Sequence, residues 1–457
     1  MSSKKYETPH FIETKQQLIQ YFADGCKNAS EFKIGTENES FLYYKNNNRR
    51  VSYKGKGGIQ NILDKYVDNF GWEPIYEKEN IVSLKKGFSC ITLEPAGQIE
   101  LSGAPQKNLH STYEEVRKYF QQLRDLEKEL NIKYLALGVD PFTIYEDRPW
   151  VEKERYIIMR EYMPQKEKLG LEMMTATATI QSNLDFSSEQ DMVCKLRLGL
   201  SLQPIITALF ASSPFSQGKL NGFQSYRSYI WQHTDPDRCG WLPWAFEGEM
   251  SFEKYVDYLL GVPMYFIQSP GNEKKMKILP ANGQTFGSFL SKGAIKNPLI
   301  RPTIKDWENH VGCVFPEVRL KKFLEMRGAD AGPISHITAL SALWAGLIYD
   351  PENLKDLSFM TKEWTNEDRH YLYKTVPRQG LATKFRGITL QILSKELLKR
   401  AAKGLKRRNN LNSSGQDESI YLEPLFAYAQ EGENLALKMI DLYKKQWLGN
   451  LDSVFNF

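Results

Sequence analysis

Acidic side chains two positions apart are the feature of this sequence that points most directly to chemistry. In residues 32–40, which read FKIGTENES, Glu37 and Glu39 share one face if the segment is an extended strand. Two neighbouring carboxylates repel each other, and a divalent cation bound through oxygen ligands would remove that repulsion. The pair therefore predicts a cation site, although a solvent-exposed strand end would show the same spacing.

Three further segments alternate between polar and apolar residues, which predicts strands with one polar face. Residues 81–105 read as a hairpin with a turn at 95–98, residues 175–186 as one strand, and residues 318–330 as another. The last segment also fits the helical period. The polar faces of the four segments carry acids and amides whose oxygens suit a cation or a polar ligand: Glu37, Glu39, Glu94, Glu100, Gln181, Asn183 and Glu325.

Basic side chains accompany the acids. A guanidinium group presents a planar set of donors that matches a carboxylate or a phosphate. Three arginines are therefore candidates for holding an anionic substrate: Arg155, Arg227 and Arg327. Residues 154–164 surround the first with aromatic residues and methionines, which fits either an anion pocket or a helix on the core. Tyr226 precedes the second, and Lys321 shares the predicted strand face of the third.

The composition is typical of a soluble globular protein, with 41% hydrophobic and 25% charged residues among 457. A net charge of +5 without a concentrated basic stripe argues against a nucleic-acid partner. The five cysteines are scattered without a C-x-x-C pair, which argues against a zinc site and a disulfide framework. The first residues, MSSKKYETPHF, have no apolar core, and we predict a cytoplasmic protein without a membrane segment.

Long segments with helical periodicity separate the predicted strands, for example residues 108–131, 388–403 and 421–447. No repeat and no linker rich in Pro, Gly or Ser divides the chain, so we predict a single domain over residues 1–457. Strands with one acidic face, joined by helices, favour an α+β protein. In such a protein the polar face of an antiparallel sheet lines a cavity and helices cover the other face.

Longer segments make the sequence resemble the glutamate–cysteine ligases of the plant and proteobacterial type. They include KIGTENES, GWEPI, LEPAGQIELSGAP, RYIIMREYMP, LQPIITALFASSPF, YRSYIW and FPEVRLKKFLEMRGADAGP. The resemblance implies a fold similar to glutamine synthetase, with a curved antiparallel sheet that forms a funnel wrapped by helices. It also implies ATP-dependent joining of the glutamate γ-carboxylate to the amine of cysteine, the first step of glutathione biosynthesis. The alternative is a related ligase that uses a different amine.

The family pattern also implies roles for individual residues. The implied cofactors are ATP and Mg²⁺, the substrates are glutamate and cysteine, and we expect a monomer or a weak homodimer. The implied metal ligands are Glu37, Glu39, Glu94, Glu100, Asn183 and Glu325. The implied nucleotide contacts are Gln181 and Lys321. The implied substrate contacts are Arg155, Arg227 and Tyr226, and the implied catalytic residues are Arg327 and Glu325.

The implied reaction agrees with the residue types. A carboxylate is a poor acyl donor, so it first becomes an acyl phosphate, which the amine then attacks. No side-chain nucleophile is needed, and the sequence has no Ser/His/Asp or Cys/His signature. Two motifs depart from the family pattern: this chain reads E-N-E-S where members often read E-H-E-K, and P-A-G-Q where they often read P-G-G-Q. Both changes leave the acids in place, which are Glu37 and Glu39 in the first motif and Glu94 and Glu100 on either side of the second.

Overall fold

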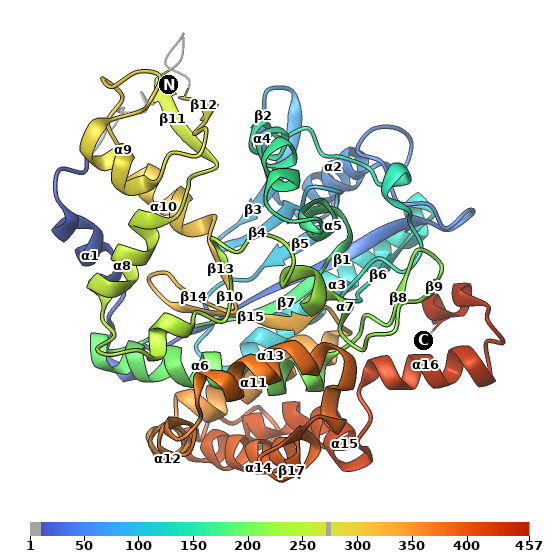
Figure 1. The fold of residues 1–457 in the computed structure, drawn as a ribbon. Coiled ribbons are helices and arrows are strands. Elements are labelled where there is room, and N and C mark those ends of the chain that lie inside the picture. The colour runs from blue at the N-terminus through green and yellow to red at the C-terminus, as the bar shows by residue number, and fades with distance from the viewer. Residues whose placement is uncertain (1–10, 271–275, 457) are drawn as a thin grey trace.

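The computed structural model describes residues 11–270 and 276–456. Its main sheet is built from β1 (Ile34–Tyr44), β2 (Glu73–Glu77), β3 (Asn80–Lys86), β4 (Ser89–Leu93), β5 (Ile99–Ser102), β6 (Ile132–Leu135), β7 (Thr179–Leu184), β14 (Val318–Leu320) and β15 (Leu324–Asp330). The strand order is β14-β15-β7-β1-β5-β4-β3-β2, with β6 also pairing with β1 (Figure 1). Every pairing in this sheet is antiparallel.

Strand β1 lies at the centre of this sheet and brings together segments that are distant in the sequence. Glu39 lies opposite Glu100 of β5, and Glu37 lies opposite Gln181 of β7. Directly opposed residues of antiparallel strands point to the same face. The acids and amides predicted on separate strands therefore share one face of one sheet.

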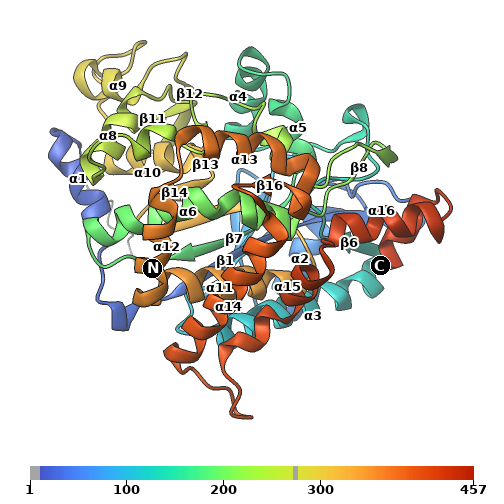
Figure 2. The same ribbon diagram turned by 60° about the horizontal axis from the view of Figure 1, so that its bottom comes forward.

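Helices cover the other face. Gly199 of α6 (Glu189–Phe210) lies against Val318 and Met326, which point away from the acidic face. Helix α11 (Ile334–Ile348) packs on β7, and α14 (Leu390–Arg408) packs on α11 (Figure 2). In α11 every residue from 336 to 348 is buried, as expected for a helix that is apolar all round. The predicted α+β protein with an antiparallel sheet wrapped by helices is confirmed, whereas the single-domain organisation stays a prediction.

Among the described residues, α6 is the one helix long and apolar enough to cross a membrane. Because 89% of its most apolar stretch is buried inside the protein, α6 has the character of a core helix.

The remaining elements complete the shell around the sheet. The other helices are α1 (Lys15–Ala23), α2 (Ile59–Phe70), α3 (Leu109–Leu130), α4 (Glu154–Tyr162), α5 (Gly170–Ala176), α7 (Tyr226–Trp231), α8 (Phe252–Gly261), α9 (Phe286–Lys292), α10 (Ile304–Gly312), α12 (Pro351–Lys362), α13 (Asn366–Gln379), α15 (Glu423–Glu431) and α16 (Leu435–Lys445). The short strands are β8 (Phe215–Ser216), β9 (Lys219–Leu220), β10 (Cys239–Gly240), β11 (Phe266–Pro270), β12 (Met276–Pro280), β13 (Phe315–Pro316), β16 (Lys384–Phe385) and β17 (Ile388–Thr389).

The predicted strand at residues 318–330 is wrong in one respect, because it is a hairpin. A tight turn, in which the Lys321 amide donates to the Phe323 carbonyl at 2.8 Å, reverses the chain between β14 and β15. Arg319 consequently lies directly opposite Glu325 instead of six residues further along one strand. The hairpin therefore places Arg319 next to Glu325, whereas a single strand would have kept the two side chains apart.

Two other predicted boundaries also differ. The start of the predicted strand at 175–186 belongs to α5, because the hydroxyls of Thr175 and Thr177 donate to carbonyls four residues earlier, at 2.7 Å in each case. The predicted helix at 421–447 is divided into α15 and α16. Gly432 ends the first of these in the left-handed region, at a φ of 76°.

Candidate active site

A cavity of about 190 Å³ lies on the acidic face of the main sheet. Strands β1, β5, β7 and β15 form its floor, while α4, α5, α7 and β13 contribute the facing walls. Most of the predicted site residues line it: Glu37, Glu39, Glu94, Glu100, Arg155, Gln181, Arg227 and Arg327. The fold thus brings acids and arginines from widely separated segments into one space.

The four carboxylates of the cavity have few partners. Glu37 accepts a hydrogen bond from the Asn183 amide at 3.0 Å, and Glu39 accepts one from the Thr179 backbone N–H at 3.1 Å. Glu100 accepts one from a serine hydroxyl at 2.6 Å. Within the described part of the chain, none of the four forms an ion pair with a basic side chain. No basic side chain therefore directly balances the charge that these carboxylates carry when they ionise.

Burial, reinforced by neighbouring acids, changes the protonation of these groups. It raises the pKa of Glu37 and of Glu100 to about 7. Burial together with Glu94 and Glu100 raises the pKa of Glu39 well above its usual range. Carboxylates that resist ionisation for these reasons would be stabilised in their charged form by a bound cation.

The donor set fits a magnesium ion that shares its ligands with a phosphate. Magnesium commonly takes one or two carboxylates together with water and phosphate oxygens. Asn183, a predicted metal ligand, does not line the cavity: its amide donates to Glu37, and its buried Oδ1 has no hydrogen-bond partner among the described residues. In those same residues no group of three or more His, Cys, Asp or Glu side chains is gathered closely enough to hold a metal by itself. The protein alone therefore offers only part of a coordination shell.

Glu325 is fully buried and does not line the cavity. Its Oε1 accepts hydrogen bonds from Arg319 at 3.0 Å and Lys321 at 2.9 Å, and its Oε2 accepts one from Arg327 at 2.6 Å. Burial alone would raise the pKa of Glu325, but these three cations hold it well below the usual range. Neither oxygen is left for a metal in this arrangement, and Lys321 is directed to Glu325 and not to the cavity.

Arg327 connects this buried cluster to the cavity. The same guanidinium nitrogen that contacts Glu325 also donates to the Gln181 side-chain oxygen, at 2.8 Å. Gln181 lies opposite Glu37 on the neighbouring strand. Glu325 and Gln181 together therefore fix the direction in which Arg327 enters the cavity.

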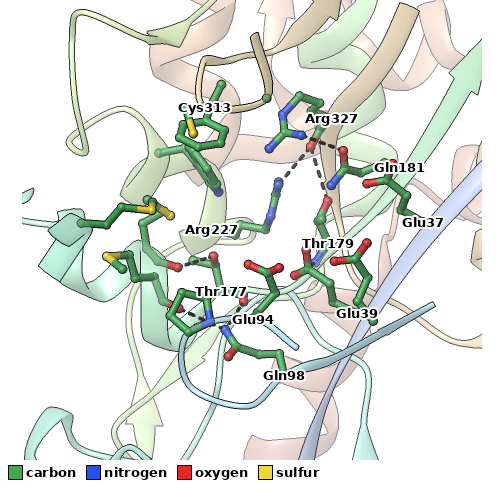
Figure 3. Close-up of a pocket in the computed structure, with 18 of the residues that line it drawn as sticks. Glu37, Glu39, Glu94, Gln98, Thr177, Thr179, Gln181, Arg227, Cys313 and Arg327 are labelled. Carbon is green, nitrogen blue, oxygen red and sulfur yellow. Dashed lines mark hydrogen bonds between the residues drawn. The ribbon is translucent and has the colours of Figure 1, made fainter. Parts of the chain in front are cut away.

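Two more arginines enter from the facing helices. Arg227 on α7 is 3% exposed and donates to the backbone carbonyl of Arg327 at 3.0 Å, while its Nε has no partner among the described residues. Arg155 on α4 is exposed, which places it at the mouth of the cavity. Figure 3 shows Arg227 and Arg327 between Cys313 on one side and Glu39 on the other.

Tyr226 does not line the cavity, and the structure gives no support to its predicted contact with the substrate. Its ring lies against those of Phe223 and Tyr229, with centroids 5.2 and 5.9 Å away. Successive residues of a helix point about 100° apart. Because Arg227 faces the cavity, Tyr226 is turned away from it.

Several cavity residues were not predicted from the sequence: Gln98, Thr177, Thr179, Arg319, Cys313, Trp231, Phe315, Met159, Met173 and Met174. Arg319 lies on the same predicted strand face as Glu325, so the alternation contains the signal for it. Gln98 lies in the turn between β4 and β5 and donates to the Thr177 carbonyl at 3.0 Å. The position of Gln98 in a turn does not show from the sequence that it faces a cavity. The apolar residues in the list are scattered along the chain, so they give no such signal either.

An acidic sheet face that carries one arginine and is opposed by two arginines from the facing helices defines an enzyme site for anionic substrates. The model of glutamate–cysteine ligase family 2 matches residues 33–456, so the chain belongs to that family. It is 44% identical over 442 residues to glutamate–cysteine ligase B, chloroplastic, of Oryza sativa subsp. japonica, covering 97% of this chain and 86% of the relative. It is also 44% identical to the chloroplastic glutamate–cysteine ligase of Arabidopsis thaliana, covering 97% of this chain and 82% of the relative.

Solved structures show weaker likeness. A bifunctional glutathione synthetase from Pasteurella multocida has 12% identity and a TM-score of 0.43, covering 94% of this chain and 50% of that one. The ligase PafA in complex with the ubiquitin-like protein Pup has 13% identity and a TM-score of 0.42, covering 92% and 70%. At these TM-scores the likeness carries no argument about function.

These comparisons confirm the predicted family and the predicted enzyme, a glutamate–cysteine ligase. They contradict the predicted cytoplasmic location, because the relatives are named chloroplastic, and that prediction is wrong. Oligomeric state, the roles of individual residues, and the absence of nucleic-acid and membrane partners stay predictions.

Proposed function

We propose that the cavity joins the γ-carboxylate of glutamate to the amine of cysteine with cleavage of ATP, giving γ-glutamylcysteine, ADP and phosphate. Membership of glutamate–cysteine ligase family 2 supports the substrates. One observation carries the proposal. A single cavity contains both the acidic face of the sheet, whose four carboxylates form no ion pair among the described residues, and arginines from three different elements. Such a cavity suits a reaction between two carboxylate-bearing molecules and a nucleotide polyphosphate.

The acidic face of the sheet is the proposed site for Mg²⁺ and the phosphates of ATP. Glu37, Glu39, Glu94 and Glu100 would hold the ion, with Asn183 as a further oxygen donor. When bound, the ion would neutralise charge on the phosphates and polarise the one being transferred. The raised pKa values of Glu37 and Glu100 support this role, because burial and neighbouring acids disfavour the charged carboxylates and a bound cation would stabilise them.

Arg327 is the proposed catalytic residue of the transfer step. In that step an oxygen of the glutamate γ-carboxylate attacks the γ-phosphorus of ATP, and ADP leaves. The guanidinium group, oriented by Glu325 and Gln181, would spread the charge on the phosphoryl group as it moves. Glu325 is thus proposed as the residue that orients Arg327, and Lys321 as a partner of Glu325, in place of the metal and nucleotide contacts expected from the family pattern.

Arg155 and Arg227 are the proposed contacts of the substrate carboxylates. Arg227 has donor capacity that the protein does not use, since its Nε lacks a partner among the described residues. The amine of cysteine then attacks the acyl carbon of γ-glutamyl phosphate, the C–O bond breaks so that phosphate leaves, and the nitrogen releases a proton to solvent. No protein nucleophile takes part.

An ADP-release assay with each component omitted in turn tests the proposal. ADP release should require glutamate, cysteine and Mg²⁺ together, and the product should have the mass of γ-glutamylcysteine. Other amino acids in place of cysteine examine the alternative acceptor, and they should react more slowly. ADP release that does not depend on cysteine would contradict the proposal.

A further inference from the structure

Asp330, at the end of β15, is a fully buried carboxylate that does not line the cavity. Within the described part of the chain it forms no ion pair, and hydrogen bonds satisfy it instead. Its Oδ2 accepts from the Ser212 backbone N–H at 2.9 Å and from the Ser213 hydroxyl at 2.6 Å. Its Oδ1 accepts from the Ser225 hydroxyl at 2.8 Å. A carboxylate only accepts, so both serine hydroxyls must donate to it.

The same two serine hydroxyls also accept hydrogen bonds from the first turn of α7. The backbone N–H of Arg227 donates to the Ser213 hydroxyl oxygen at 3.2 Å. The backbone N–H of Ser228 donates to the hydroxyl oxygen of Ser225, the N-cap residue, also at 3.2 Å. Because Asp330 takes the only proton of each hydroxyl, the lone pairs of both serines are left for α7.

Helix α7 needs such support because it has only six residues. A helix of that length has little stability of its own, so its orientation depends on the groups that hold its ends. Both Arg227 and Trp231 reach the cavity from this helix. The Arg227 side chain is also held by β15, through the carbonyl of Arg327 at 3.0 Å.

The two backbone carbonyls that precede Asp330 are also held by side-chain hydrogen bonds. The pairing of β15 with β7 shifts register between Met326 and Ala329. Thr207 donates its hydroxyl to the Gly328 carbonyl at 2.9 Å, and Thr179 donates its hydroxyl to the Ala329 carbonyl at 2.7 Å. The end of β15 that carries Asp330 is therefore held by hydrogen bonds from both α6 and β7. Burial lowers the pKa of Arg227, and the charge of Asp330 is the strongest influence opposing that change.

We propose that Asp330 is a positioning residue: through Ser213 and Ser225 its carboxylate sets the first turn of α7 so that Arg227 faces the cavity. The inference rests on the proposed function, in which Arg227 holds a substrate carboxylate.

Asp330→Asn tests the proposal, because the amide keeps the shape but has one acceptor oxygen where the carboxylate has two. We expect the KM for one amino-acid substrate to rise about tenfold, the effect of losing one charge-assisted contact, with kcat changed less than threefold. Arg227→Met should raise the same KM. In the Asp330→Asn/Arg227→Met double variant KM should rise no further than in Arg227→Met alone. A purely structural role for Asp330 would not produce this loss of additivity.

Asp350→Asn is the matched control. Asp350 is also a buried aspartate, it caps α12 and pairs with Arg407 at 2.6 Å, and it does not line the cavity. Its replacement should lower the melting temperature without changing either KM. If Asp330→Asn does not fold, Ser225→Ala and Ser213→Ala keep the carboxylate but remove one link each, and each should raise the same KM.

Amide hydrogen exchange separates this inference from the proposed function. Asp330→Asn should speed exchange in α7 relative to Asp350→Asn. Suppose that Arg227→Met leaves both KM values unchanged while Asp330→Asn still speeds amide exchange in α7. The substrate role of Arg227 then fails and the positioning role of Asp330 stands. If Arg227→Met raises KM but Asp330→Asn and the serine variants change neither KM nor α7 exchange, the positioning role is overturned.

Discussion

Replacing Glu100 by glutamine should stabilise the protein while abolishing ligation. Glu100 is 8% exposed, and burial together with Glu94 raises its pKa from 4.5 to about 7. A folded-state pKa above the unfolded value means that the folded state binds the proton more tightly. Ionisation of Glu100 therefore costs stability, and the cost grows as the pH rises from about 4.5 to about 7 and is constant above that range.

The size of the effect follows from the two pKa values. They correspond to about 3 kcal/mol of lost stability at pH 8 and about 1 kcal/mol at pH 5.5. Glutamine removes this cost. With an unfolding entropy of roughly 2.1 cal/mol/K per residue, the melting temperature should rise by roughly 3 °C at pH 8 and roughly 1 °C at pH 5.5.

Thermal unfolding in chelated buffer at the two pH values measures this effect. Glu79→Gln, at an exposed carboxylate outside the cavity, is the control and should change little at either pH. Addition of Mg²⁺ with a non-hydrolysable ATP analogue should stabilise the wild type more than Glu100→Gln. The reasoning is refuted if Glu100→Gln melts below the wild type at pH 8, or if its shift is the same at both pH values.

Three other substitutions test the remaining parts of the site. Glu325→Gln should destabilise the protein by about 3–5 kcal/mol in denaturant unfolding, because two buried arginines and the half-buried Lys321 lose their anionic partner. A neutral result would contradict that assignment. Arg327→Lys should lower kcat by about 100-fold or more with little change in KM, since a lysine cannot contact Gln181 and the phosphoryl group as a planar guanidinium does; steady-state kinetics with unchanged kcat would exclude the proposed role. Tyr226→Phe should leave both KM values within about twofold, because the ring is packed away from the cavity; a tenfold rise would restore it as a substrate contact.

The alternation of polar and apolar residues was enough to find the acidic strands. Glu37 and Glu39 were predicted on one face, and the structure places them so that Glu39 lies opposite Glu100. What the alternation could not show is which strands are neighbours, because pairing depends on contacts between segments far apart in the chain. The quoted family segments supplied that arrangement, and the antiparallel sheet wrapped by helices agrees with it.

The errors have local physical causes. One three-residue turn converts the predicted strand at 318–330 into a hairpin, and this alone places Arg319 across from Glu325. Glu325, which we expected to bind a metal, is thereby surrounded by three basic side chains. Asp330 gave no signal in the sequence, because its partners are serines more than 100 residues away.

The central claim is that ATP activates the γ-carboxylate of glutamate as an acyl phosphate in this cavity. Glutamate labelled with ¹⁸O in the γ-carboxylate tests it directly, because the oxygen that attacks phosphorus leaves with the phosphate. With cysteine, ATP and Mg²⁺ present, each inorganic phosphate released should carry one ¹⁸O atom. Unlabelled phosphate, formed together with γ-glutamylcysteine, would contradict the account.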